Sequence, residues 1–271
     1  MPAFRTLAVI FAGLSFVMLS GCVTTTKGGA VGADSSQFML ISSEQLEQTA
    51  ALGYSKLKTE AAEKGALNQD EKLLKRVREI AERIERQTGT FRQDAPGWKG
   101  EVNIIDSNEL NAFAMPGGKI MFYSGLIKRL QLTDDEIAVV MGHEIAHALR
   151  EHSREQVSRA IAAQAAMGVG SAVLGLGQNT TQLAGMVYDA LIATKFSRTD
   201  EAEADRIGLE LTARAGYNPR AAISLWQKMM NAKSGGQPPE FLSSHPADST
   251  RIQQIESLLP TVMPLYQATR R

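Results

Sequence analysis

The chain of 271 residues has a single cysteine, Cys22, so no disulfide bond can form within it. It also lacks net charge, because 29 lysines and arginines balance 29 aspartates and glutamates. Aromatic residues make up only 6% of the sequence, and lysines and arginines do not form a stripe along any segment. These absences argue against a nucleic-acid-binding protein. No internal repeat indicates an array of small modules.

Long apolar runs are scarce, and the first lies near the N-terminus. Leu7 to Leu19 follows Arg5 and is too short for a comfortable membrane span, which favours a secretory signal peptide over residues 1–21. The run ends in a lipobox, so we expect Cys22 to be lipidated and to begin the mature chain. Because Val23 rather than aspartate follows, we expect lipid anchoring in the outer membrane, with the body in the periplasm. The alternative is a cytoplasmic protein with an accidentally apolar start.

A second apolar region covers residues 160–194. Ala160 to Leu176 is just long enough to span a membrane, and Leu183 to Thr194 follows, interrupted by Asp189. This region either inserts into the membrane as a hairpin or packs over the active site as a lid. We favour the lid, because a lipid anchor already holds the chain and its glycines weaken a free-standing helix while permitting close packing.

The mature chain divides into a linker and one domain. Residues 22–40 include a Thr/Gly/Ala-rich stretch, Thr24 to Asp34, that has no packing pattern, so we expect a lipidated tether. Residues 41–265 are long enough for one domain with a substantial core. Their periodicity predicts an α+β fold that is mostly α-helical, with one short strand and one hairpin. The expected elements are helices at 42–64, 68–88, 133 to about 152, 219–230 and 248–259, a strand at 102–106, and a hairpin of 112–115 with 119–123.

The most informative motif is His143-Glu144-Ile145-Ala146-His147. A capping box at Thr133 to Glu136 and an apolar stripe predict that it lies on a buried amphipathic helix. Two histidines four residues apart on one helical face can share a zinc ion, and the glutamate between them faces the open coordination position. The alternative is two helical histidines with ordinary hydrogen bonds.

A catalytic zinc site needs a third protein ligand. A second helix, which starts near Ser197 and stops at Gly216, carries Glu201 and Asp205 on one face beside Ala204 and Gly208. Such small residues allow two helices to approach closely. Glu201 can then complete the zinc site, and Asp205 can accept the second N–H of a liganding histidine. The alternative is an acidic helix face exposed to solvent.

Taken together, these motifs resemble the HtpX / type I CAAX prenyl protease family of zinc metallopeptidases, in its small bacterial lipoprotein branch with BepA and LoiP. The likeness covers residues 40–265. Four stretches carry it in the family's order: Asn111 to Gly118, His143 to His147, Arg198 to Asp205, and Ser244-His245-Pro246 with Arg251-Ile252.

The resemblance implies a zincin-like domain with a small β-sheet beside the motif helix. It implies one Zn²⁺ held by His143, His147 and Glu201. Glu144 would be the general base, and Asp205 an outer partner of the ligands.

Two histidines lie outside the H-E-x-x-H motif, His152 and His245. The resemblance puts His245 near the substrate or the open metal position, where it is our candidate donor to the oxyanion. A turn role, or an inhibitory one in a loop that covers the metal, is the alternative. His152, expected at the end of the motif helix, is assigned a structural or helix-dipole role rather than ligation.

Substrate binding is expected at the hairpin. A strand beside the zinc helix offers unpaired backbone groups, so an extended peptide can bind there by strand addition. The resemblance around Asn111, Ala112 and Phe113 favours this edge over a purely structural hairpin. Backbone recognition suits unfolded polypeptides as substrates.

Together these features predict a membrane-tethered zinc endopeptidase that hydrolyses peptide bonds of unfolded or misassembled envelope proteins. The endopeptidase part follows from residues, and the quality-control part is implied by family and location. The alternative is a chaperone-like outer-membrane assembly factor with latent protease activity and envelope assembly or protease partners. A purely structural zinc site is disfavoured, because such sites usually have four protein ligands and often cysteine.

Overall fold

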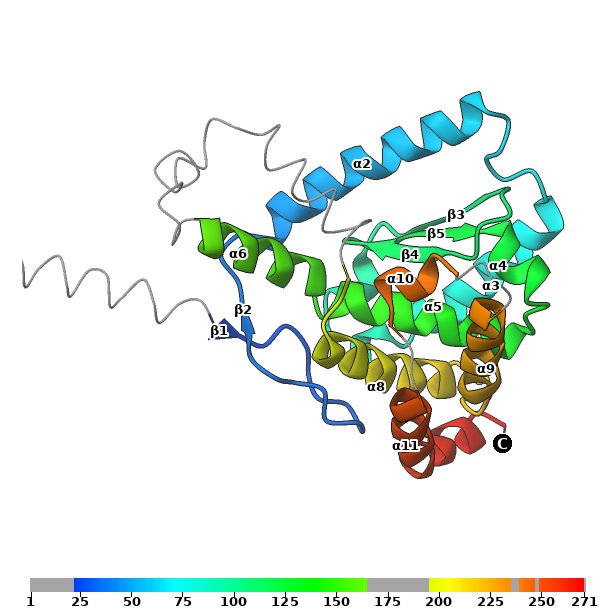
Figure 1. The fold of residues 1–271 in the computed structure, drawn as a ribbon. Coiled ribbons are helices and arrows are strands. Elements are labelled where there is room, and N and C mark those ends of the chain that lie inside the picture. The colour runs from blue at the N-terminus through cyan, green and yellow to red at the C-terminus, as the bar shows by residue number, and fades with distance from the viewer. Residues whose placement is uncertain (1–21, 165–194, 235–238, 247–248, 271) are drawn as a thin grey trace, which may run out of the picture.

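The computed structural model describes residues 22–164, 195–234, 239–246 and 249–270 (Figure 1). The predicted signal peptide and most of the apolar region 160–194 lie outside these residues. Within them, no helix is both long and apolar enough to cross a membrane. The strands are β1 (Cys22–Val23), β2 (Gln37–Phe38), β3 (Glu101–Ile105), β4 (Ala112–Met115) and β5 (Lys119–Tyr123). The helices are α2 (Ser43–Glu63), α3 (Glu71–Glu85), α4 (Ser124–Arg129), α5 (Asp134–Leu149), α6 (His152–Gln164), α8 (Arg198–Arg214), α9 (Ala221–Ser234), α10 (Phe241–Ser244) and α11 (Ser249–Ala268), with 3₁₀ turns at Thr88–Thr90 and Ala95–Gly97.

A three-stranded sheet forms the β part of the domain, in the order β3-β5-β4. β3 runs parallel to β5, whereas β4 and β5 form an antiparallel hairpin with Ala112 opposite Phe122. The predicted hairpin is therefore confirmed. Its turn needs Gly117 and Gly118, because both have positive φ angles, 76° and 73°. β4 is an edge strand among the described residues.

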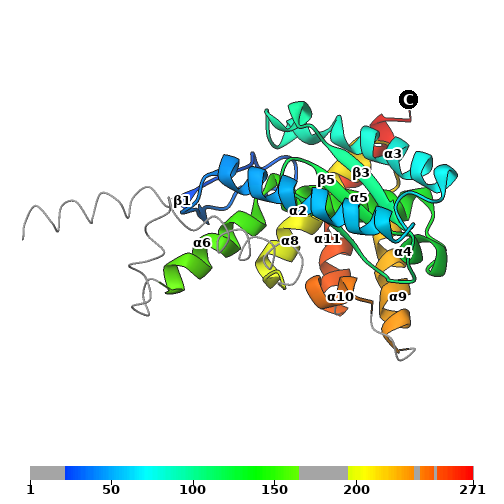
Figure 2. The same ribbon diagram turned by 90° about the horizontal axis from the view of Figure 1, so that it is seen from above.

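The sheet lies between helices (Figures 1 and 2). On one face α2 packs against Phe113, Met115 and Met121, and the hydroxyl of Tyr54 donates a hydrogen bond to the Ile120 carbonyl at 2.7 Å. On the other face, Ala112, Ile120 and Phe122 join the main core with α3, α5 and α8. The alternation of side chains along each strand therefore divides the interior into two clusters. The predicted α+β, mostly helical fold is confirmed.

Helices α5 and α8 cross at unusually close range. A Cβ atom added to Gly142 would lie 2.7 Å from the carbonyl oxygen of Gly208, and one added to Gly208 would lie 2.8 Å from the His143 nitrogen. Both positions therefore need glycine, since the two backbones touch. The predicted approach of small residues is confirmed at Gly208, and it brings the first turn of α8 over the histidines of α5.

The predicted helix from 133 to about 152 is interrupted. α5 ends at Leu149, and α6 begins at His152 after Glu151, whose φ of +52° breaks the helical path. The sequence predicts His152 at the end of the motif helix, but His152 is the first residue of the next helix. This turn directs it back toward the residues of α5.

The expectation of an unpacked tether at Thr24 to Asp34 is wrong. β1 pairs with β2, and within the segment Thr26, Val31 and Ala33 are buried. Glu210 of α8 accepts hydrogen bonds from the backbone nitrogens of Ala30 at 2.7 Å and Val31 at 3.2 Å. Hydrophobic periodicity missed this segment because polar groups, rather than an apolar stripe, hold it to the domain.

Candidate metal centre

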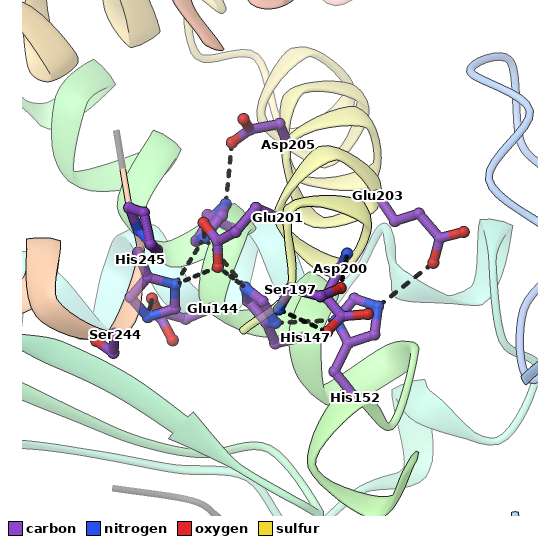
Figure 3. A network of polar contacts seen from close by, with 12 residues as sticks. Glu144, His147, His152, Ser197, Asp200, Glu201, Glu203, Asp205, Ser244 and His245 are labelled. Atoms are coloured by element: carbon purple, nitrogen blue, oxygen red, sulfur yellow. Dashed lines mark hydrogen bonds and ion pairs between the residues drawn. The ribbon is translucent and has the colours of Figure 1, made fainter. Parts of the chain in front are cut away.

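Four buried side chains converge between α5, α8 and the end of α10 (Figure 3). His143 and His147 come from α5, Glu201 from the first turn of α8, and His245 directly follows α10. One possible ligand atom from each lies within 4.8 Å of all the others. None of the four residues is more than 4% exposed. The sequence predicted the first three as ligands, and the structure adds His245 to the same cluster.

Local capping fixes where Glu201 lies. Ser197 and Asp200 form a reciprocal capping box, with Ser197 Oγ accepting from the Asp200 nitrogen at 3.2 Å and Asp200 Oδ2 accepting from the Ser197 nitrogen at 2.9 Å. This starts α8 at Arg198, about three turns before the crossing at Gly208. The Glu201 carboxylate consequently spans both histidines, with Oε1 3.4 Å from His147 Nε2 and Oε2 3.5 Å from His143 Nε2.

His245 covers the cluster. Its Nδ1 lies 2.8 Å from Glu201 Oε1 and 3.2 Å from His143 Nε2. The ring stacks on Phe241, with centroids 4.5 Å apart, and on Phe196 at 5.4 Å. The Phe196 nitrogen also donates to the Ser244 carbonyl at 3.2 Å. These contacts hold the imidazole inside the cluster, where it is only 2% exposed.

The donor set fits a zinc ion. Zinc prefers four ligands drawn from imidazole nitrogens, carboxylate oxygens and thiolates, and this cluster offers three imidazoles and one carboxylate. His143 Nε2 and His147 Nε2 lie 3.1 Å apart. A shared cation or proton would stabilise these two buried nitrogen atoms at so short a distance.

The protonation of the two α5 histidines differs. Burial, followed by the neighbouring charge of His143, lowers the pKa of His147 well below 6.5, so its ring is in the neutral form that binds metals. Burial opposes charge on His143, but hydrogen bonds to Asp205 and Glu201 outweigh it and raise the pKa to about 9. A metal ion entering the cluster would replace that proton.

Asp205 and Arg251 form an outer layer on the far side of His143. Asp205 Oδ1 lies 3.1 Å from His143 Nδ1, the position expected for an outer partner of a ligand. Arg251 of α11 donates to both Asp205 oxygens, at 2.7 and 2.8 Å. Its Nη1 also lies 2.5 Å from Glu201 Oε2, and its guanidinium stacks 3.7 Å above the Trp226 ring.

The sequence predicts no role for Arg251, which belongs only to one of the stretches that carry the family resemblance. The signal available was the pair of acids on one buried helix face, Glu201 and Asp205, which requires a cation nearby. That cation comes from a helix about 50 residues away, and no local pattern identifies it.

Glu144 faces the cluster from α5. Its Oε2 accepts a hydrogen bond from the backbone nitrogen of Ala114 in β4 at 3.1 Å. Its Oε1 has no hydrogen-bond partner among the described residues, although His245 Nε2 lies 3.5 Å away. Burial raises the pKa of the Glu144 carboxyl, which makes it a stronger base.

The predicted substrate strand lies beside Glu144. Ala112 and Phe113 belong to β4, while Asn111 precedes it and accepts a hydrogen bond from the Tyr123 nitrogen through its carbonyl at 3.0 Å. Both strand side chains are buried. This edge can therefore present backbone groups, but not these side chains, to a substrate. The Ala114 N–H points to Glu144 rather than to β5.

The sequence also singled out Cys22 and His152. Cys22 begins β1 and pairs with Phe38. His152 Nδ1 lies only 2.9 Å from His147 Nδ1, at the edge of that ring away from Glu201 (Figure 3). The sequence expectation of a structural or dipole role for His152 did not foresee this contact.

Comparison with known proteins connects this geometry to a family. The model of Peptidase family M48 matches residues 71–259, which include every member of the cluster. The metalloendopeptidase OMA1 of Bos taurus is 34% identical over 193 residues, covering 65% of this chain and 36% of that protein. OMA1 of Saccharomyces cerevisiae is 33% identical over 178 residues, covering 63% and 50%.

A bacterial relative is similar over the same region. The beta-barrel assembly-enhancing protease of Escherichia coli is 29% identical over 171 residues, covering 60% of this chain and 35% of that protein. The chain thus spans between about a third and a half of the length of these curated relatives.

Proposed function

Because the chain belongs to peptidase family M48 and is thereby a zinc metalloendopeptidase, we propose that it cleaves unfolded or misassembled proteins of the bacterial envelope. The observation that carries the proposal is the convergence of His143, His147 and Glu201 around one point, with Glu144 beside them and hydrogen-bonded to an edge strand. Three donors and an adjacent carboxylate are what a catalytic, rather than a structural, zinc site requires.

The metal ligands in this proposal are His143, His147 and Glu201. When bound there, zinc supplies a Lewis acid that polarises the scissile carbonyl and makes a water molecule acidic near neutral pH. Asp205 accepts hydrogen bonds from Nε and Nη2 of Arg251, and it keeps the His143 ring oriented. Arg251 also balances the charge of Glu201.

Glu144 moves the proton. Its Oε2 is held by the Ala114 N–H, which leaves Oε1 to take a proton from the attacking water. The same carboxyl then delivers that proton to the leaving amine. A raised pKa suits both steps, since the group must hold the proton between them.

Substrate binds along β4. An extended peptide laid on the free edge of β4 runs past Glu144, because the Ala114 N–H of that edge already contacts its carboxylate. Strand addition reads backbone more than side chains, so it selects for unfolded segments rather than for a sequence. In this proposal Asn111, Ala112 and Phe113 belong to the edge along which the peptide binds.

His245 is a fourth donor in this conformation. Its Nδ1 points among the ligand atoms, and its ring is packed by Phe241 and Phe196. Movement of the segment around His245 would open this buried cluster to water and substrate. The alternative role, donor to the oxyanion, requires the displaced imidazole to stay beside the reacting carbonyl.

The location proposed is the outer membrane, with lipidated Cys22 as anchor and the domain in the periplasm. The lipobox supports the anchor. The similarity to a beta-barrel assembly-enhancing protease supports substrates or partners in envelope assembly. OMA1 relatives are named as mitochondrial, so the lipid anchor needs its own test: a Cys22→Ser variant should leave the membrane fraction.

A second candidate is a chaperone-like assembly factor that uses the same edge without cleaving. The covered cluster favours it, since both Glu144 and His245 are 2% exposed. Complementing a deletion strain separates the two functions. Rescue of envelope integrity by wild type but not by Glu144→Gln supports the peptidase, and full rescue by Glu144→Gln supports the assembly factor.

The test of the peptidase itself is biochemical. Purified protein should contain one zinc per chain, and should cleave casein in a reaction that a chelator abolishes and added zinc restores. A protein that folds but holds no zinc would overturn the assignment.

A further inference from the structure

The ring of His147 makes two distinct sets of contacts. On its Nε2 side are His143 at 3.1 Å and Glu201 at 3.4 Å, so this nitrogen faces the metal cluster. On its Nδ1 side is His152, 2.9 Å away and 1% exposed. His143 has the same arrangement, with Asp205 on its Nδ1 side. His152 therefore stands to His147 as Asp205 stands to His143.

The hydrogen-bond directions follow from the chemistry of imidazole. When His147 Nε2 binds a metal, its only proton lies on Nδ1, which must donate. His152 Nδ1 must then accept, which places the His152 proton on Nε2. That nitrogen lies 3.4 Å from Glu203 Oε2, a carboxylate oxygen that can only accept. One arrangement of protons thus satisfies His147, His152 and Glu203 together.

Glu203 is in turn held by the N-terminal segment. Arg150, which is fully buried, donates from Nε to Glu203 Oε2 at 2.9 Å. The Ser35 hydroxyl donates to Glu203 Oε1. Arg150 also donates to the Ser35 carbonyl at 3.0 Å and to Thr26 Oγ1 at 3.1 Å. A series of contacts therefore runs from His147 through His152 and Glu203 to the segment before α2.

We propose that His152 is a positioning residue for the zinc ligand His147, and that the packed segment 24–38 sets the zinc affinity of the site through Ser35, Arg150 and Glu203. The inference rests on the proposed function for the ligand role of His147. Glu203 increases the electron density on His152, which strengthens its acceptance of the His147 proton and so the bond of Nε2 to a cation. Release of the segment would loosen this support without touching a ligand.

The first experiment measures zinc affinity of the full chain by competition with a chromophoric chelator. His152→Phe keeps a ring beside Phe196 but has no nitrogen, and we expect an affinity about 10–100-fold weaker than that of wild type. His152→Asn places an amide oxygen where Nδ1 was, and should stay within about threefold of wild type. Ser158→Ala, which removes the part-buried hydrogen bond that α6 accepts from the Leu40 nitrogen, is the matched control.

Cobalt substitution gives a readout that a merely structural role would not move. The visible spectrum of bound Co²⁺ reports ligand geometry, so it should shift in His152→Phe and remain like wild type in His152→Asn and Ser158→Ala. Equal affinity and equal spectra in all four proteins would overturn the proposal. A wild-type protein that holds no zinc would instead overturn the proposed function.

The second experiment tests the N-terminal part and serves if His152→Phe does not fold. Ser35→Ala removes the hydroxyl that contacts both Glu203 and Arg150. Thr24→Ala, in the same segment, removes only an exposed hydrogen bond to Asp34 and is the control. We expect zinc affinity to fall several-fold in Ser35→Ala alone, with metal-free melting temperatures alike. Identical affinities in the two variants would refute the role of the segment.

Discussion

The carboxylate of Glu144 is hydrogen-bonded to the backbone nitrogen of Ala114 at 3.1 Å, so the buried glutamate of the H-E-x-x-H motif is tied to the edge strand of the sheet. One residue thereby connects the surface that would bind a peptide with the point where that peptide would be cut. The position of Glu144 does not depend on a flexible loop, since both partners lie in regular elements.

Replacing Glu144 by glutamine should separate metal binding from cleavage. The amide has nearly the same shape but cannot take a proton, so casein cleavage should fall by about 10²–10⁴-fold while zinc stays bound. Zinc content by atomic absorption and cleavage by gel densitometry measure the two effects. Undiminished proteolysis in this variant would remove Glu144 from the role of base.

Replacing His245 by alanine should open the site. Three donors remain to hold zinc, and water gains the place that His245 Nδ1 takes among the ligand atoms. We expect cleavage of unfolded casein to rise several-fold with zinc content unchanged. A fall of about 10²–10³-fold would instead identify His245 as the donor to the oxyanion.

Replacing Arg251 by methionine should destabilise the metal-free protein strongly. The change leaves Glu201 and Asp205 as buried carboxylates without their cation, and removal of one partner from a buried ion pair costs about 3–5 kcal/mol. Urea denaturation measures the loss. Added zinc should restore more stability to this variant than to wild type, because the ion replaces part of the missing positive charge; equal recovery would contradict the charge-balancing role.

Acidification should weaken the junction between α5 and α6. Burial opposes the charge of Glu151, but the Ser43 hydroxyl, Arg92 and Arg154 outweigh it and lower the pKa of this carboxyl from 4.5. A lowered folded pKa contributes stability above about pH 4.5 that is lost as the pH falls through the lower value. The free energy of unfolding of wild type should therefore decline more steeply between pH 5 and about pH 3 than that of Glu151→Gln. Parallel declines would show that Glu151 is not the group responsible.

The convergence of side chains from α5 and α8 could be predicted because the signals for it are local. Spacing of four residues puts two side chains on one helix face, and capping boxes at Thr133 and Ser197 mark where each helix starts. Small residues on α8 indicated the close crossing, and Gly208 has that role.

The supporting residues could not be predicted, because they depend on contacts distant in sequence or on a single backbone angle. A helix continued through Glu151 would direct His152 away from His147, and only the positive φ of Glu151 turns it back. Arg251 is matched to its acids across about 46–50 residues. Likewise, the segment from Thr24 to Asp34 has few apolar residues, yet it supplies backbone and hydroxyl partners to charges on α8 and at the end of α5.

Those partners also affect how the protein can be shortened. A recombinant fragment that begins at residue 41 would retain the whole metal cluster, yet it would strip Arg150 and Glu210 of the hydroxyl, carbonyl and amide groups that surround them. Both residues are fully buried in the intact chain. Truncation designed around the catalytic motif alone would thus leave Arg150 with Glu203 and Glu210 with Arg214 but without their partners from the N-terminal segment, and the soluble product should begin near residue 22 instead.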